Sequence, residues 1–115
     1  MKRGEIWLAD LNPRYGTEPG KTRPVLVIQA QALLDAGHPS TLIVPLTSNV
    51  AADAEPLRIP VPASGRLLRQ SDLLIDQLRA IDNERLVDGP LVTLPPPLMR
   101  AVEDALMQVI GLDEG

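Results

Sequence analysis

The segment that decides the fold of this 115-residue chain runs from residue 16 to residue 28 and reads Gly16-Thr17-Glu18-Pro19-Gly20-Lys21-Thr22-Arg23-Pro24-Val25-Leu26-Val27-Ile28. A polar, glycine-containing loop here delivers Arg23 to the start of an apolar, β-branched run, which predicts a buried strand. Pro24 biases Arg23 toward an extended backbone. A guanidinium held in this way binds a phosphate or carboxylate through two hydrogen bonds. The segment therefore predicts an anion site or, in a plainer interpretation, a surface arginine with a local ion pair.

Strand patterns continue on both sides of this segment. Residues 5–11 alternate well enough to form a strand with Ile6 and Leu8 on one face and Trp7 and Ala9 on the other. Residues 30–36 are expected to form a short helix or turn. Further strands are expected over residues 25–29, 41–46, 57–61 and 71–82.

Two of these strands carry an expected irregularity. Pro45 has no N–H to donate, so the strand over residues 41–46 should end or lie on a sheet edge there. The apolar phase of residues 71–82 changes between Ile75 and Leu78, which is typical of a bulge. We expect Leu73, Ile75, Leu78 and Ala80 to point inward.

A C-terminal helix follows Pro95-Pro96-Pro97, since prolines suit the first turn of a helix and Gly111 suits its end. Its apolar face covers either the chain's own sheet or a second subunit. That face consists of Leu98, Ala101, Val102, Ala105, Leu106, Val109 and Ile110. The pattern predicts one domain over residues 1–115, a small bent β-barrel with the helix on one side, which favours a homodimer to complete its core.

Composition excludes several kinds of chemistry. The chain has no cysteine and one histidine, His38, which lies in a turn-like stretch. Disulfides, thiolate nucleophiles, histidine-pair catalysis and multi-histidine metal sites are therefore excluded. Carboxylates, arginines and hydroxyls remain. No residue run is apolar enough to span a membrane or to form a signal peptide, so we expect a cytoplasmic protein.

The formal net charge is −4, which on its own argues against nucleic acid binding. The distribution of charge is more favourable to nucleic acid binding. All 11 lysines and arginines lie within residues 1–100, where 11 acidic residues balance them. The excess comes from Glu103, Asp104, Asp113 and Glu114. An acidic protein with a locally basic cleft still binds a short single strand, with strong salt dependence.

Several blocks of this sequence, in colinear order, resemble the MazF/PemK family of toxin endoribonucleases. They are Met1 to Leu11, Gly16 to Gly20, Arg23 to Ile28, Val44 to Asn49 and Asp76 to Leu86. The resemblance spans nearly the whole chain, which makes it more specific than any single motif. It implies an SH3-like barrel, the MazF/CcdB-like toxin fold, assembled as a homodimer.

The resemblance also implies a reaction and a partner. Members of the family cleave single-stranded RNA without a metal or other cofactor, by attack of a 2′-hydroxyl on the adjacent phosphorus. The products are a 2′,3′-cyclic phosphate and a 5′-hydroxyl. A cognate antitoxin, MazE/PemI-like, neutralises the toxin with an acidic segment that folds across it. The net negative charge of this chain departs from what the resemblance leads us to expect. It weakens the case that the acidic antitoxin segment is captured by electrostatic attraction alone.

Three residues are candidates for the catalytic roles that the resemblance implies. Arg23 matches the catalytic arginine and would hold the non-bridging phosphate oxygens. Thr47 matches the active-site threonine and would donate a hydrogen bond to the same phosphate. Glu18 is the nearest carboxylate in sequence to Arg23 and the natural base, because an arginine retains its proton at neutral pH. In the plainer interpretations Glu18 is a solvated turn residue and Thr47 bonds its own turn.

RNA-binding candidates surround these three residues. Thr17 and Ser48 belong to the matching loop and strand-exit blocks, and Tyr15 would stack on a base or pack on its turn. Gln77 and Arg79 resemble the family's strand pair near the RNA groove. Steering charges are expected at Lys21, Arg66 and Arg69, each of which has a solubilising surface role as its alternative.

Two other classes of protein remain open. One is a toxin that binds gyrase on the same barrel fold, because fold alone does not fix function. Against it, the chain keeps Arg23 and Thr47 together and has no aromatic residue at its C-terminus. The other is a noncatalytic RNA- or protein-binding barrel, which the retained polar residues disfavour.

Overall fold

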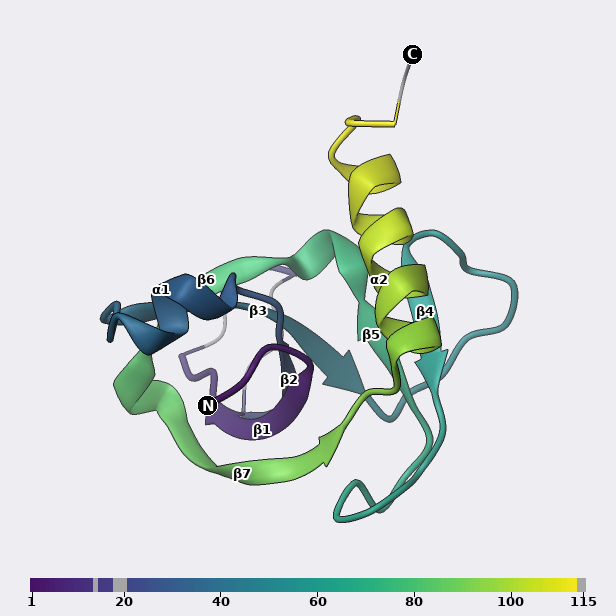
Figure 1. Cartoon of the computed structure of the whole chain (residues 1–115). Helices are drawn as coiled ribbons and strands as arrows, with labels where there is room; N and C mark the ends of the chain where they lie inside the picture. The colour runs from purple at the N-terminus through teal and green to yellow at the C-terminus, as the bar shows by residue number, and fades with distance from the viewer. Residues whose placement is uncertain (14, 18–20, 114–115) are drawn as a thin grey trace.

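The structure is a computed structural model that describes residues 1–13, 15–17 and 21–113. Within these residues the elements are β1 (Glu5–Asp10), β2 (Thr22–Val27), α1 (Gln31–Asp35), β3 (Ser40–Thr47), β4 (Arg58–Val61), β5 (Ser71–Leu74), the 3-10 turn η1 (Ile75–Gln77), β6 (Arg79–Asp82), the 3-10 turn η2 (Asn83–Arg85), β7 (Leu86–Thr93) and α2 (Pro96–Val109). Figure 1 shows the strands curving round into a small barrel with α2 beside it.

The strands pair in the order β4-β5-β3-β2-β1-β7, and β6 pairs with β3. All of these pairings are antiparallel, and β3 is long enough to pair with β6 through its first half and with β5 through its last two residues. The barrel with a C-terminal helix confirms the predicted fold class. The consequence for function is that the start of β2 and the end of β3 meet at one end of the barrel.

The core is aliphatic. Its fully buried side chains come from strands β1 to β5, from the turn η1 and from α2, and include Leu26, Val44, Leu73, Ile75 and Val102. A second cluster beneath Trp7 contains Ala9, Val25 and Ile81, among others. With few aromatic rings to fill space, the interior depends on close packing of branched side chains.

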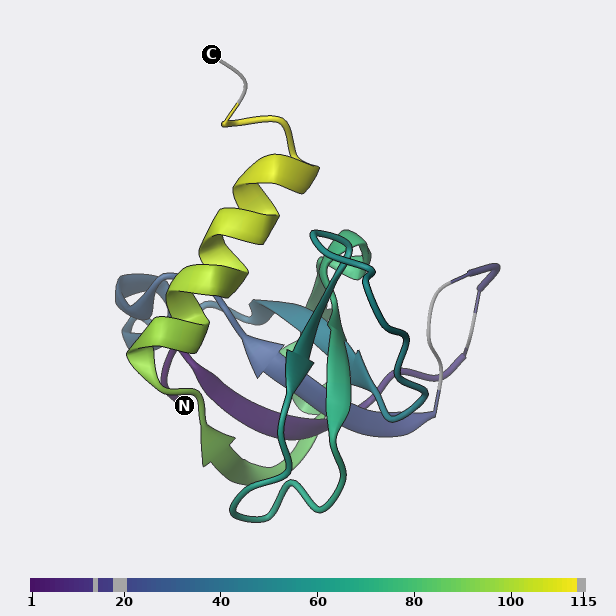
Figure 2. The ribbon, with the colours of Figure 1, turned by 90° about the vertical axis from the view of Figure 1, so that its right-hand side faces the viewer.

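Helix α2 begins at the prolines, as expected, and Gly111 follows it with φ +78°, a conformation that favours glycine. Val102 and Ala105 are buried against the barrel, whereas Ile110 is 54% exposed, so this end of the apolar face does not cover the chain's own sheet and its alternative, a second subunit, stays a prediction. The reason is visible in Figures 1 and 2, where the C-terminal turns of α2 extend beyond the sheet. Among the described helices, none is long and apolar enough to cross a membrane.

The expectation for Pro45 was wrong. β3 runs through Pro45, which lies opposite Val25 of β2 in the middle of the sheet. On the other edge of β3, pairing with β6 stops at Ile43 and pairing with β5 starts at Leu46. Pro45 therefore occupies the gap between two partner strands, where a missing donor interrupts no ladder.

The bulge expected within residues 71–82 is instead the 3-10 turn η1, which separates β5 from β6. Leu73 and Ile75 are fully buried, as expected. Ala80 is exposed and Ile81 is buried, so the expected inward position of Ala80 is wrong. The three-residue turn η1 displaces the chain further than a single bulged residue would. As a result, the residues of β6 that face the core differ from those that a bulge would place there.

Strand β7 had no counterpart in the sequence analysis, because Asp88-Gly89-Pro90 is typical of a turn. It pairs with β1 through a register that shifts twice, with Leu8 opposite Asp88. Gly89 lies under the Trp7 ring, where a Cβ atom would stand 2.4 Å from Cδ2 of Trp7. Close contact with an aromatic ring therefore explains a glycine inside this strand.

Candidate functional site

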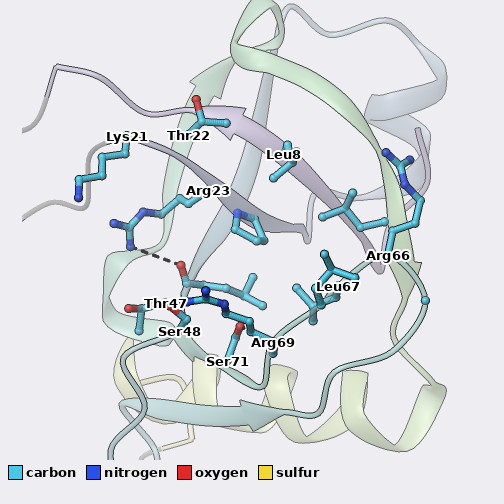
Figure 3. Close-up of a pocket in the computed structure, with 15 residues that line it drawn as sticks. Leu8, Lys21, Thr22, Arg23, Thr47, Ser48, Arg66, Leu67, Arg69 and Ser71 are labelled. Carbon is cyan, nitrogen blue, oxygen red and sulfur yellow. Dashed lines mark hydrogen bonds between the residues drawn. The ribbon is translucent and has the colours of Figure 1, made fainter.

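A cavity of about 720 Å³ opens at the end of the barrel where β2 begins and β3 ends (Figure 3). Six parts of the chain line it: β1, the start of β2 with the residue before it, the end of β3 with its exit, the loop before β5, the start of β5, and β7. The lining residues are Leu8, Lys21, Thr22, Arg23, Pro24, Leu46, Thr47, Ser48, Gly65, Arg66, Leu67, Leu68, Arg69, Ser71 and Leu91.

Arg23 is half-buried and presents its guanidinium to this cavity (Figure 3). Its backbone lies in β2 opposite Ala9 of β1, next to the buried Val25. Nη1 of Arg23 donates to the carbonyl oxygen of Leu46 at 3.4 Å. A sheet position and a carbonyl contact therefore orient the guanidinium, which is the arrangement that binds an anion with little loss of side-chain freedom.

Thr47 is the last residue of β3 and lines the same end of the cavity as Arg23. Its Oγ1 accepts a hydrogen bond from the backbone N–H of Asn49 at 3.2 Å. Because the hydroxyl acts as acceptor there, its own hydrogen remains available to donate to a bound ligand. Ser48 follows at the mouth and adds a second hydroxyl.

Four cationic side chains line the cavity, and none of the described lining residues is acidic. They are Lys21, Arg23, Arg66 and Arg69. Arg66 forms an ion pair with Asp88 of β7, and its Nη1 also donates to the Pro90 carbonyl oxygen at 3.5 Å. A cationic concave surface on an acidic protein concentrates a negatively charged ligand at this place.

Lys21 has a strained backbone that the surrounding chain holds in place. Its φ is +66°, a left-handed conformation that is uncommon for a residue with a Cβ atom. The Lys21 N–H donates to Oδ1 of Asn12 at 2.8 Å, and its carbonyl oxygen accepts from the N–H of Leu11 at 2.9 Å. Arg85 donates to the carbonyl oxygens of Asp10 and Asn12. This network closes the base of the loop over residues 12–21 and fixes where Lys21 enters the cavity.

An apolar wall also lines the cavity, and Figure 3 shows its Leu67 across from Arg23, next to the cationic Arg66. Leu46, Leu67 and Leu91 are almost fully buried, and Leu8 and Pro24 complete this wall. Leu68 lies at the mouth with 86% of its surface exposed. The sequence analysis assigned none of these residues to the site, because strand periodicity marks such residues as core and does not show that they also border a cavity. Ser71 was missed as well, and its hydroxyl donates to the Arg69 carbonyl oxygen.

Six of the residues predicted for the site lie on the cavity: Arg23, Thr47, Lys21, Ser48, Arg66 and Arg69. Tyr15 and Thr17 are exposed and do not line it. Gln77 ends η1 and Arg79 lies opposite Ile43 on β6, so neither borders it. Glu18 lies outside the described residues. The proposed roles of all eleven residues stay predictions, and for the first six the structure supplies a shared place on the cavity.

The fold and the cavity together define a small β-barrel protein with a cationic, hydroxyl-bearing site suited to a phosphate-containing ligand. Comparison with known proteins identifies the family more closely. The family model described as PemK-like, MazF-like toxin of type II toxin-antitoxin system matches residues 2–110. The chain is 34% identical to Endoribonuclease EndoA of Bacillus subtilis (strain 168) over 116 residues, which cover 97% of this chain and 96% of that protein.

Two solved structures show the same fold. MazF (Form-I) from Deinococcus radiodurans superposes with a TM-score of 0.78 at 23% identity, covering 96% of both chains. An endoribonuclease in complex with its cognate antitoxin from Mycobacterial species gives a TM-score of 0.74 at 22% identity, covering 98% of this chain and 97% of that one. The chain belongs to the PemK-like, MazF-like toxin family of type II toxin-antitoxin systems.

Proposed function

We propose that this protein is a toxin endoribonuclease that cleaves single-stranded RNA at a phosphate bound between Arg23 and Thr47. The observation that carries the proposal is their convergence: β2 and β3 bring both side chains to one end of a cationic cavity. Membership of the toxin family and 34% identity to an endoribonuclease support the same function.

The reaction that fits these residues is an internal transfer of the phosphoryl group. The 2′-oxygen of the nucleotide bonds to the adjacent phosphorus as the bond from phosphorus to the 5′-oxygen breaks. A base takes the 2′-proton and an acid protonates the departing 5′-oxygen, so the products are a 2′,3′-cyclic phosphate and a 5′-hydroxyl. Negative charge grows on the non-bridging oxygens, where preorganised donors are most effective.

Arg23 and Thr47 supply those donors. The guanidinium neutralises the charge on the non-bridging oxygens, and the Thr47 hydroxyl donates its free hydrogen to the same phosphate. Removing one preorganised donor of this kind costs about 10² to 10³ in rate. We assign the base role to Glu18, which belongs to the loop whose base the Asn12 and Arg85 contacts close. Arg23 is the candidate acid.

The remaining cavity residues bind the rest of the substrate. Lys21 and Arg69 contact neighbouring phosphates, and Ser48 adds a hydroxyl donor. The apolar wall formed by Leu8, Pro24 and the buried leucines excludes water from the reacting phosphate. A reaction without a metal is what the family resemblance implies, and the described lining residues, which offer cations and hydroxyls, are consistent with it.

We infer that the protein works in the cytoplasm as a homodimer that a cognate antitoxin of the MazE/PemI type neutralises. The solved relative with its cognate antitoxin supports such a partner. Exposed apolar side chains on the projecting end of α2 and beyond it support pairing of two copies, since Met107, Ile110 and Leu112 are 42%, 54% and 72% exposed. Burying them against a second copy removes this apolar surface from water.

Cleavage of a long single-stranded RNA tests the proposal. The purified protein is incubated with the RNA in excess EDTA, together with Arg23→Ala and Arg100→Ala variants. Arg100 is an exposed arginine of α2 that does not line the cavity. We expect wild type and Arg100→Ala to cut at the same sites, and Arg23→Ala to lose about 100-fold or more in rate. Intact RNA with wild type would refute the function and favour a toxin that acts by binding.

A further inference from the structure

A buried carboxylate lies directly behind the cavity. Asp72 of β5 is 2% exposed and stands opposite Thr47 in the pairing of β5 with β3. Its Oδ2 accepts hydrogen bonds from the N–H of Ala51 at 2.9 Å and from Nη1 of Arg58 at 3.3 Å. Asp72 does not line the cavity, whereas its neighbour Ser71 does, so Asp72 has no direct contact with a ligand there.

Arg58 links this carboxylate to the exit of β3. Its Nη1 also donates to the carbonyl oxygen of Asn49 at 2.8 Å, and the N–H of Asn49 donates to Oγ1 of Thr47 at 3.2 Å. A path of contacts therefore runs from Asp72 through Arg58 to the Asn49 carbonyl, and through the backbone of Asn49 to its N–H and the Thr47 hydroxyl. Ala51, two residues further on, is bonded to the same carboxylate.

Stability alone is a poor explanation for this arrangement. The side chain of Asp72 is 3% exposed and that of Arg58 is 28% exposed, so the desolvation cost falls mainly on the carboxylate, and a well-packed apolar pair of similar size is often as stable or more so. A charged pair does, however, orient the backbone groups to which it is hydrogen-bonded. The Arg58 guanidinium lies between the Asp72 carboxylate and the Asn49 carbonyl, so it orients the peptide group that joins Asn49 to Val50 and restrains the Asn49 backbone.

We propose that Asp72 and Arg58 are positioning residues that hold the segment Asn49 to Ala51 and thereby orient the Thr47 hydroxyl toward the reacting phosphate. This inference rests on the proposed function. The Asn49 N–H fixes which lone pair of Thr47 Oγ1 is occupied, and hence the directions open to its hydrogen. Loss of the Arg58 contact frees the Asn49 backbone, which carries the N–H bonded to Thr47, and leaves the hydroxyl without a set direction.

A double-mutant cycle between Arg58 and Thr47 tests the inference. We measure kcat and KM for wild type, Arg58→Met, Thr47→Ala and the double variant, on an RNA with one mapped cut site. We expect Arg58→Met to lower kcat about 10- to 100-fold, as a misplaced donor does, with KM changed less than about twofold. In the Thr47→Ala background, Arg58→Met should cost less than about twofold more, because it acts through Thr47.

Arg3→Met is the matched control. Arg3 also joins a carboxylate, that of Glu103 at 2.8 Å, to a backbone carbonyl, that of Ile28 at 3.0 Å, and it does not line the cavity. Its side chain is 35% exposed against 28% for Arg58. We expect unchanged kcat for this variant in both backgrounds. Arg58→Lys retains a donor and should recover part of the kcat lost in Arg58→Met.

Two further measurements keep the inference testable if a variant is poorly folded or wild type is inactive. Asp72→Asn retains an acceptor oxygen for Ala51 but removes the charge that holds Arg58, so it should lower kcat in the same direction as Arg58→Met. Amide exchange at Asn49 and Ala51, followed by NMR, should accelerate in Arg58→Met and not in Arg3→Met. This readout needs no activity, so an inactive wild type would refute the proposed function without deciding the inference.

The inference is overturned by any of three results. The kcat losses of Arg58→Met and Thr47→Ala multiply in the double variant, Arg58→Met leaves kcat unchanged, or the exchange of the Asn49 and Ala51 amides is the same in wild type and Arg58→Met.

Discussion

Replacing Asp88 with asparagine is expected to tighten RNA binding, because this carboxylate competes with RNA phosphate for Arg66. Arg66 lines the cavity, yet its guanidinium is paired with Asp88 of β7. In Asp88→Asn the ion pair is lost while the side-chain shape is kept. Arg66 then contributes its full charge to the cavity, alongside the unshared charge of Arg69.

The size of the expected gain in RNA affinity follows from the solvent exposure of the Arg66–Asp88 ion pair. The Arg66 and Asp88 side chains are 58% and 48% exposed, and an exposed ion pair contributes at most about 1 kcal/mol. Its loss therefore improves the binding constant by up to about fivefold at low salt. Each neutralised phosphate of a single strand changes the slope of log K against log salt by about −0.7. If the four cations of the cavity contact three or four phosphates, the wild-type slope is between about −2 and −3.

Fluorescence anisotropy on an RNA with a 2′-deoxy nucleotide at its cut site, which cannot be cleaved, gives the binding constant between 50 and 300 mM salt. Asp88→Asn should steepen the slope, Arg69→Gln should reduce its magnitude by about 0.7, and Arg66→Gln should reduce it by less. Arg100→Gln is the control and should change neither slope nor affinity. Weaker binding in Asp88→Asn, or equal slopes for all four variants, would refute the reasoning.

Three other substitutions test the packing and the loop network. Leu73→Ala, at a fully buried core position, should lower the free energy of unfolding by about 2 to 5 kcal/mol in a urea titration, and a cost under 1 kcal/mol would contradict its place in the core. Gly89→Ala should cost about 1 to 3 kcal/mol by the same assay, since the added Cβ meets the Trp7 ring, and an unchanged urea midpoint would show that the contact relaxes freely. Arg85→Met should lower kcat/KM about tenfold through loss of the two carbonyl contacts at the base of the loop over residues 12–21, with the urea midpoint nearly unchanged. Full activity in Arg85→Met would show that this hydrogen-bond network does not contribute to catalysis.

The sequence predicted the barrel and the meeting of Arg23 with Thr47, because both depend on strong local patterns and on a colinear resemblance. Strand β1, strand β3 and helix α2 have clear apolar periods and boundary residues. The sequence predicted an anion site on one loop but not the cavity. The cavity depends on the pairing of β2 with β3, which brings the end of β3 beside the start of β2.

The features that the sequence did not predict depend on contacts between distant segments. Nothing local distinguishes Asp88-Gly89-Pro90 from a turn, and only the Trp7 ring across the sheet explains it as part of β7. Pro45 fits inside a strand because β6 ends and β5 begins on either side of it. Asp72 was overlooked because its role depends on Arg58, which enters from a neighbouring strand.

The identity of the RNA ends formed by the wild-type protein tests the central claim most directly. Mass spectrometry of the fragments, with the normal substrate and with one that carries a 2′-deoxy nucleotide at the cut site, shows which oxygen attacks phosphorus. We predict a 2′,3′-cyclic phosphate and a 5′-hydroxyl from the normal RNA, no cleavage of the deoxy substrate, and the loss of both products in Arg23→Ala. Ends that carry a 5′-phosphate, or cleavage that survives the 2′-deoxy change, would contradict the proposed reaction at Arg23 and Thr47.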